Sequence, residues 1–397
     1  MKQFDQDEEK VGQENEEDLQ GLSKANFSEA VLWGTDWTTE TIISQLKKGN
    51  IELSPSFQRR DAWGPDRKSS FIESIILGLP IPQIILAERK DKRGAYIVID
   101  GKQRLLSIRQ YSVVDEDDEF QSLKLIGLKV LDDLNGKTYK ELSEQLDFSK
   151  YNNVFDNQSI RTIIIRNWPS QTFLYTVFLR LNTGSLPLSP QELRQALNPG
   201  PFTSFADNFS IESQQIKKAL NIKKPDYRMR DVEVVVRYFA FKNFMVKYTG
   251  NLKEFLDNTC AELNEKWKID NSEILLQAEE LNQAIDTTYK IFGSNAFSKF
   301  SNDEFTGIFN RPVFDLMTYY FSAPEIRNAT IGKEREIVDC FIGLCLNDIE
   351  FLKSLEASTK NTSAVAKRFN EWGNGLKRTL NLNIAIPEKA VVGIIIK

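Results

Sequence analysis

The feature that most constrains this chain is a strand that runs directly into a helix at residues 97–106. The apolar run Ile-Val-Ile ends at Asp100 and Gly101, and an amphipathic helical pattern begins within two residues. Lys102 and Arg104 therefore lie in the first turn of a helix, where the helix dipole and the exposed N–H groups attract anions. The segment predicts a site that binds phosphate or another anion.

Each side chain at this junction has two readings. Asp100 can coordinate a metal ion or orient water, although an aspartate before glycine is also an ordinary turn residue. Gln103 and Arg104 can contact phosphoryl oxygens, or they can cap and solvate the helix. The sequence leaves both readings open for these three residues.

The complete absence of histidine limits the available chemistry. None of the 397 residues is histidine, which excludes Ser-His-Asp and Cys-His nucleophiles, histidine-containing zinc sites and nucleases that activate water with histidine. Any catalysis must use carboxylates, lysine, arginine, amides, hydroxyls or a bound metal ion.

The pattern of apolar residues predicts an α+β fold in two domains after an acidic leader. Residues 1–20 carry eight acidic and two basic side chains, so the leader (1–30) supplies the negative charge and the rest of the chain is close to neutral. In the domain at 31–188 we expect a small mixed sheet, and in the domain at 189–397 we expect helices. The expected strands are 83–87, 96–99, 125–131 and 160–165; the expected helices of the first domain are 39–48, 66–77, 102–113, 138–147 and 171–181; those of the second are 229–247, 252–265, 273–292, 312–321, 333–355 and 363–380.

The remaining composition predicts a cytoplasmic protein without a membrane span. No apolar stretch approaches 18 residues and no secretory signal begins the chain. Cys340 and Cys345 lie in an apolar helical run, which favours buried, reduced thiols over a disulfide or a metal pair. The apolar run at 391–396 is expected to pack against the body of the protein or a partner.

Two further clusters contain candidate site residues. Arg59 lies in an arginine-rich loop bounded by aromatic residues, which suits nucleotide binding or an ordinary solvated turn. Asn182 and Arg194 flank the segment Ser-Pro-Gln-Glu at 189–192, which has the pattern of a capping box. Glu192 therefore reads as a capping residue more readily than a catalytic one, whereas capping does not explain Asn182 and Arg194.

A basic segment at 217–230 is the best candidate for contact with nucleic acid. It carries six basic side chains against one acidic residue, Asp226, and only Tyr227 adds an aromatic ring. A solvated connection between helices is the alternative. The residues expected to contact phosphates are Lys217, Lys218, Lys223, Lys224 and Arg228.

Four ordered motifs resemble the N-terminal domain of GmrSD-type restriction endonucleases, over roughly residues 36–240. They are Phe-Gln-Arg-x-x-x-Trp at 57–63, Ile-Glu-Ser-Ile-Ile-Leu-Gly-Leu-Pro-Ile-Pro at 72–82, Val-Ile-Asp-Gly-Lys-Gln-Arg-Leu at 98–105, and Phe-x-Arg-Leu-Asn-Thr-Gly followed by Pro-Leu-Ser-x-x-Glu-Leu-Arg at 178–194. The resemblance implies a fold similar to ParB and sulfiredoxin, with nucleotide binding and NTP hydrolysis in defence against phage or modified DNA.

The family's Asp-Gly-Gln-Gln-Arg motif carries over to Asp100, Gly101, Gln103 and Arg104. The chain departs from the motif at Lys102, which replaces the usual first glutamine. The resemblance also places Arg59 and Trp63 in the family's upstream loop. Many relatives continue into a histidine-dependent nuclease domain of the HNH type, which a chain without histidine cannot form. The effector is then a separate polypeptide, or the protein is a stand-alone sensor.

The leading hypothesis is a nucleotide-binding, NTP-hydrolysing regulatory module of a bacterial defence system. Asp100, Gln103 and Arg104 are its candidate catalytic residues, with Mg²⁺ held at Asp100. The candidate nucleotide-binding residues are Arg59, Gly101, Lys102, Asn182 and Arg194. The alternative is a non-enzymatic module that binds DNA or a partner on the same scaffold. A homo-oligomer and a separate effector nuclease are possible partners.

Overall fold

The computed structural model describes residues 29–53, 60–115, 118–181, 189–356, 360–391 and 393–397. Contacts divide the chain into two compact units after Leu197. We call the described residues up to Leu197 the first unit and those from Asn198 the second unit. The division expected after residue 188 lies at the edge of a segment outside the described residues and stays a prediction.

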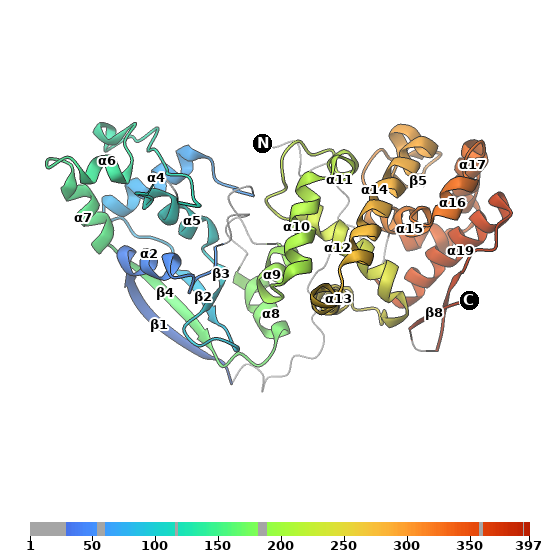
Figure 1. The fold of residues 1–397 in the computed structure, drawn as a ribbon, viewed down its shortest axis with the longest axis horizontal. Helices are drawn as coiled ribbons and strands as arrows, with labels where there is room; N and C mark the ends of the chain where they lie inside the picture. Colours follow the sequence, from blue (N-terminus) through green and yellow to red (C-terminus); the bar gives the residue numbers. More distant parts are fainter. Residues whose placement is uncertain (1–28, 54–59, 116–117, 182–188, 357–359, 392) are drawn as a thin grey trace. The chain divides into compact units, whose positions relative to one another are not determined.

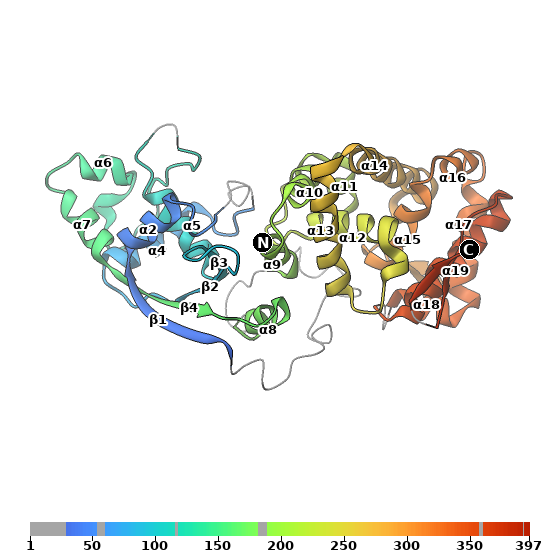
Figure 2. The same cartoon turned by 60° about the horizontal axis from the view of Figure 1, so that its bottom comes forward.

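The first unit is built on a four-stranded mixed sheet with the strand order β1-β4-β2-β3 (Figure 1). Strand β4 pairs antiparallel with β1 and parallel with β2, and β2 pairs antiparallel with β3. The long, curved β1 forms one edge (Figure 2). This arrangement confirms the predicted small mixed sheet and three of its predicted strands. The strands are β1 (Val31–Thr38), β2 (Ile84–Glu88), β3 (Tyr96–Asp100) and β4 (Ser159–Arg166).

Helices cover both faces of this sheet. Successive residues of β2 alternate between two apolar cores, with Ile84 and Leu86 in one core and Ile85 and Ala87 in the other. The first core is shared with α2, α4, α5, α6 and α7, and the second is shared with α8 and α9. The helices are α2 (Thr39–Lys47), α4 (Pro65–Ile76), α5 (Lys102–Tyr111), α6 (Tyr139–Ser143), α7 (Ser149–Asn157), α8 (Gln171–Leu181) and α9 (Pro190–Leu197).

The predicted strand at 125–131 is wrong. This segment is irregular and leads into the single-turn helix η2 (Asp132–Leu134). The Glu73 carboxylate accepts hydrogen bonds from the backbone N–H groups of Val130 and Leu131, each at 2.9 Å. A side chain 57 residues away in sequence therefore satisfies the backbone donors that a neighbouring strand would otherwise pair.

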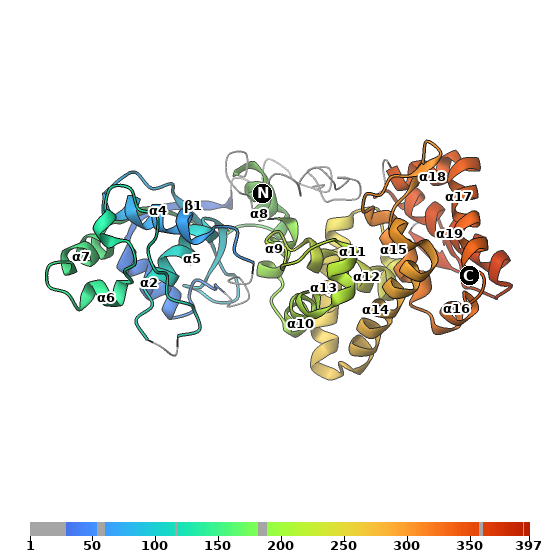
Figure 3. The ribbon, with the colours of Figure 1, turned by 90° about the horizontal axis from the view of Figure 1, so that it is seen from above.

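The second unit is mostly helical, which confirms the predicted α+β fold class with a helical C-terminal region. Helices α12, α14 and α15 pack between the helices near its start and α17 and α19 near its end (Figure 3). Its helices are α10 (Pro201–Glu212), α11 (Gln214–Ala219), α12 (Arg230–Phe244), η3 (Met245–Lys247), α13 (Leu252–Ile269), α14 (Ser272–Phe292), η4 (Gly293–Asn295), α15 (Arg311–Phe321), α16 (Pro324–Ala329), α17 (Glu334–Asn347), α18 (Ile349–Glu356) and α19 (Thr362–Leu380).

Two short hairpins complete the second unit. One pairs β5 (Phe300–Ser301) with β6 (Glu304–Phe305), and the other pairs β7 (Pro387–Lys389) with β8 (Ile394–Ile396). Strand β8 contacts η3, which agrees with the expected packing of the apolar run at 391–396. All three cysteines are free thiols; Cys345 is buried as predicted, whereas Cys340 is only partly buried. In the described part of the chain no helix is long and apolar enough to cross a lipid bilayer.

Candidate functional site

The predicted junction of strand and helix is present where β3 ends at Asp100 and α5 begins at Lys102. Gly101 is the N-cap of α5, and its φ of 100° places it in the left-handed region that glycine adopts without strain. A Cβ at this position would lie 3.2 Å from a side-chain carbon of Ile84 and 3.3 Å from Nε of Arg104. The close approach and the backbone conformation both require glycine.

Replacing Gly101 with alanine should destabilise the first unit by more than the roughly 1 kcal/mol that a left-handed alanine costs. The additional loss arises because the new methyl group displaces Ile84 and Arg104. Gly78→Ala is the matched control, since Gly78 has a φ of 69° and no atom within 4 Å of an added Cβ. Urea denaturation of both variants measures the difference, and equal losses would show that the contacts have no energetic weight.

Arg104 folds back over the junction. Its Nη2 donates to Oδ2 of Asp100 at 2.7 Å and to the backbone oxygen of Gln83 at 3.0 Å. The guanidinium is largely buried, whereas about a quarter of the Asp100 side chain is exposed. Arg104, which the sequence predicts to bind phosphate, is thus held by the Asp100 carboxylate. Its buried donor Nε has no partner among the described residues.

Lys102 forms a buried ion pair with Glu192 of α9. Its Nζ lies 2.5 Å from Oε1 of Glu192, and each side chain is only 6% exposed. Glu192 also completes the predicted capping box, because its Oε2 accepts from the backbone N–H of Ser189 at 2.7 Å while Ser189 Oγ accepts from its N–H. One carboxylate therefore caps α9 and ties it to the start of α5.

Two amide side chains at the same helix starts are buried with an unused polar atom. Within the described residues, Oε1 of Gln103 and Nε2 of Gln191 have no hydrogen-bond partner. Gln103 follows Lys102 on α5, and Gln191 precedes Glu192 on α9. Leaving a buried polar atom unpaired costs about 1–3 kcal/mol, so such atoms mark positions where water or a ligand is expected.

The other residues that the sequence predicts to bind nucleotide are Arg194, Arg59 and Asn182. Arg194 is fully buried, and its Nη1 donates to Oε1 of Gln191 at 2.6 Å. Because residues two positions apart on a helix do not share a face, Arg194 and Glu192 point in different directions from α9. Arg59 and Asn182 lie outside the described residues. The structure therefore brings Asp100, Gly101 and Arg104 together, with Lys102 linked to α9.

A metal ion at this site would need ligands beyond the protein. Asp100 offers one carboxylate, with Oδ2 already bonded to Arg104. Among the described residues no group of three or more cysteines, aspartates or glutamates is arranged to hold a metal. Mg²⁺ commonly binds through one or two carboxylates together with substrate phosphates. The donor set at the junction fits a metal that arrives with a nucleotide.

The basic segment (217–230) lies in the second unit and spans the end of α11, a loop and the start of α12. Lys218, Lys223 and Lys224 are exposed, and none of them forms an ion pair with a described carboxylate. Arg230 pairs with Asp226, which also accepts from the backbone N–H of Arg228 at 2.6 Å. The predicted surface is therefore accessible and positively charged.

Sequence reasoning missed the partner of Lys102 and the amide of Gln191. The capping pattern at 189–192 is readable from sequence, but a capping glutamate carries no mark of a second partner 90 residues away. It also missed Tyr289 and Phe309, which lie beside the basic segment in space. No local pattern connects these aromatic residues with the lysines.

A family model matches this chain over the stretch that contains the candidate site. The GmrSD restriction endonuclease N-terminal domain matches residues 39–198, from the first residue of α2 to just past α9. The match confirms the resemblance drawn from the four motifs for this stretch. No curated protein and no solved structure matches the chain.

Proposed function

We propose, from the GmrSD restriction endonuclease N-terminal domain at residues 39–198, that this chain binds and hydrolyses a nucleoside triphosphate as the regulatory module of a restriction-type defence system. The observation that carries the proposal is the β3–α5 junction. There a left-handed glycine begins a helix whose first turn carries two ion-paired cations, and the buried atoms Nε of Arg104 and Oε1 of Gln103 have no described partner. A phosphoryl oxygen can accept a hydrogen bond from Nε of Arg104, and a water molecule bound beside the phosphates can donate to Oε1 of Gln103.

Binding proceeds by exchange of partners. In this structure the carboxylates of Asp100 and Glu192 neutralise Arg104 and Lys102. A triphosphate carries more negative charge than either carboxylate and forms stronger charge-assisted hydrogen bonds with the two cations. The N–H groups in the first turn of α5 add donors that point toward the same anion.

Each junction residue then has a role. Arg104 and Lys102 hold phosphoryl oxygens, and Gln103 positions a phosphate or the attacking water. Asp100, released from Arg104, holds Mg²⁺ or orients that water. Bound Mg²⁺ would neutralise charge on the phosphates. Arg59, in the upstream loop, is proposed to stabilise the developing charge.

The direct test measures phosphate release from each NTP with Mg²⁺. We expect Arg104→Ala to lower the rate by at least about 100-fold, since removing one donor to a developing oxyanion has an effect of this size. Arg109→Ala is the control, because Arg109 lies on the same helix, is similarly buried and pairs with Asp118 away from the junction. Equal rates for the wild type and Arg104→Ala would reject the site assignment.

The second candidate is a non-enzymatic module that binds nucleic acid on the same scaffold. It is favoured by the exposed, unpaired lysines of the basic segment. Salt-sensitive binding of nucleic acid without phosphate release would support this candidate over the first. In either case we propose that the protein is a stand-alone sensor or acts with a separate effector nuclease, since none of the 397 residues is histidine and an HNH site needs one.

A further inference from the structure

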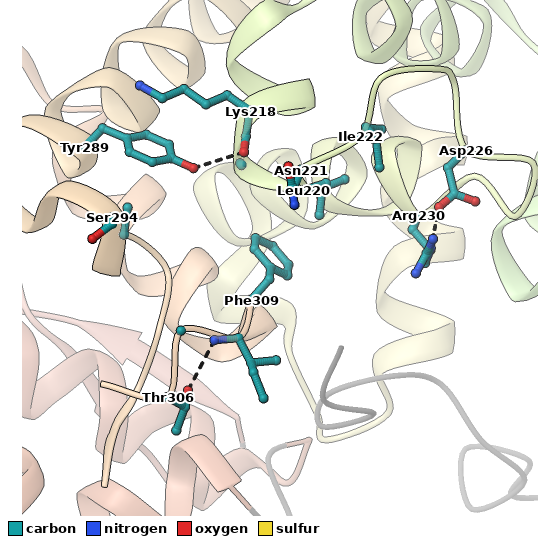
Figure 4. Close-up of a pocket in the computed structure, with 14 residues that line it drawn as sticks. Lys218, Leu220, Asn221, Ile222, Asp226, Arg230, Tyr289, Ser294, Thr306 and Phe309 are labelled. Carbon is teal, nitrogen blue, oxygen red and sulfur yellow. Dashed lines mark hydrogen bonds and ion pairs between the residues drawn. The ribbon is translucent and has the colours of Figure 1, made fainter. Parts of the chain in front are cut away.

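A pocket of about 740 Å³ lies directly beside the basic segment, within the second unit (Figure 4). One wall is formed by the end of α11 and the following turn at 218–222. The opposite wall is formed by the loop at 306–309 before α15, with Tyr289 of α14 beside them. The volume lies in the range of pockets that bind nucleotide-sized ligands.

The rim of the pocket is positively charged. The segment 217–230 carries five more basic than acidic side chains. Lys218 lies at the rim with its Nζ 3.9 Å from the centre of the Tyr289 ring, while the Tyr289 hydroxyl donates to the Lys218 backbone oxygen at 3.0 Å. Lys223 and Lys224 extend the charge along the neighbouring loop and are exposed. This row of cations suits a chain of phosphates rather than a single anion.

The interior of the pocket offers an aromatic ring and free polar groups. Phe309 lies near the turn that contains Leu220 and Asn221 (Figure 4), and its ring is only partly buried by Phe297 and Phe314. The side chains of Asn221 and Ser294 line the pocket and make no hydrogen bond with a described residue. The ring can stack on a flat heterocycle, while the amide and the hydroxyl form hydrogen bonds with the edge of that heterocycle.

We propose that this pocket receives one unpaired base of a single-stranded nucleic acid whose phosphates follow the basic segment. The proposal deepens the second candidate function and rests on it. Bases in a duplex are stacked and paired, and taking one out costs several kcal/mol of binding energy. Single strands present their bases freely, so a pocket beside a phosphate-binding row selects them. The aromatic ring of Phe309 supplies stacking that tolerates different bases.

The test uses the full chain and a fluorescently labelled oligothymidylate, with anisotropy measured over a range of salt concentrations. We expect the single strand to bind at least about tenfold more tightly than its duplex with oligoadenylate. Lys223→Ala/Lys224→Ala should weaken binding and reduce the slope of log affinity against log salt by about 1.4. Lys266→Ala/Lys268→Ala is the matched control, since both lysine side chains lie at the surface of α13, where Lys266 pairs with Glu273 of α14 and Lys268 pairs with Glu265.

Two pocket variants separate base binding from phosphate binding. Phe309→Leu keeps apolar volume against Phe297 and Phe314 but removes the flat ring, so affinity should fall about tenfold with an unchanged salt slope. Asn221→Gly keeps the left-handed backbone (φ 50°) and removes the amide without disturbing the core. It should also weaken binding of the single strand.

Three outcomes would overturn the proposal. If the duplex binds as tightly as the single strand and both pocket variants behave as wild type, the phosphate-binding surface stands without a base pocket. If polyglutamate competes as effectively as the oligonucleotide, the surface belongs to an acidic protein partner. If neither nucleic acid binds with salt dependence, the second candidate function fails together with this inference.

Discussion

Replacing Asp315 with asparagine should lower the free energy of unfolding of the second unit by about 3–5 kcal/mol. Asp315 lies on α15, is 1% exposed and accepts hydrogen bonds from Nε (3.0 Å) and Nη2 of Arg237. Nη2 of Arg368 lies 3.8 Å from the same carboxylate. Nearby, Arg311 and Arg237 also pair with Glu233. The Asp315 carboxylate thus faces two buried guanidiniums, those of Arg237 and Arg368.

The energetic effect follows from removing a buried negative charge that faces two guanidiniums. Burial lowers the pKa of Arg368 to about 10, while Asp315 opposes this shift. Burial alone would lower the pKa of Arg237, but the charge and hydrogen bond of Asp315, together with the charge of Glu233, raise it above its ordinary value. Asparagine keeps the volume and loses the charge, so Arg237 and Arg368 lose the attraction of the Asp315 carboxylate. Both guanidiniums remain charged at neutral pH, which makes the loss large.

Calorimetry and urea denaturation measure this loss as a shift in the unfolding transition of the second unit. Glu350→Gln provides the control, since the Glu350–Lys353 pair is exposed on α18. An exposed pair contributes at most about 1 kcal/mol, so this variant should unfold close to the wild type. A loss below about 1 kcal/mol for Asp315→Asn would mean that solvent or another group neutralises the cluster.

Local sequence signals predicted most elements of the fold because those elements depend on neighbouring residues. The alternation of apolar residues at 84–87 places two side chains in each core of the first unit. The capping box at 189–192 opens α9 as expected. Helix α4 begins one residue earlier than the predicted start at Asp66, because Pro65 occupies the first helical position after Gly64.

The errors occur where a distant residue decides the local structure. The segment 125–131 has strand-like composition, yet Glu73 binds its backbone from another helix. The stretch 333–355 was expected to form one helix but forms α17 and α18. Asp348 separates them because its Oδ1 accepts from the backbone N–H of Phe351 at 3.0 Å. The sequence does contain a signal for this break, since aspartate is a preferred N-cap residue and Asp348 lies between the two helices.

The candidate site also combines locally encoded elements with contacts that depend on distant residues. The turn at Asp100 and Gly101 and the helix that follows are encoded locally, and the structure contains them. The sequence predicts that Lys102 and Arg104 are both available to bind one anion. In the structure each cation holds a carboxylate, and the partner of Lys102 comes from α9. Only tertiary packing brings these residues together, so no local pattern reports the pairing.

Replacing Glu192 with glutamine should destabilise the unliganded first unit by about 3 kcal/mol, yet increase its affinity for nucleotide. Glutamine retains the reach needed to cap Ser189, so the variant removes the charge and keeps the cap. Lys102 then stays buried without its carboxylate, which is costly. If Lys102 binds phosphate, the triphosphate no longer competes with Glu192 for it. The nucleotide should then restore more stability to this variant than to the wild type.

Thermal unfolding with and without each NTP and Mg²⁺, together with calorimetric titration, measures both effects. Glu141→Gln is the matched control, because Glu141 completes the capping box of α6 with Thr138 but is exposed and forms no ion pair with a described lysine. Its stability should change by a few tenths of a kcal/mol, with no change in nucleotide affinity. If both glutamine variants behave alike, Glu192 acts only as a cap. If Glu192→Gln is destabilised but nucleotide restores nothing, Lys102 is a structural cation, because a phosphate ligand would have taken the place of the lost carboxylate.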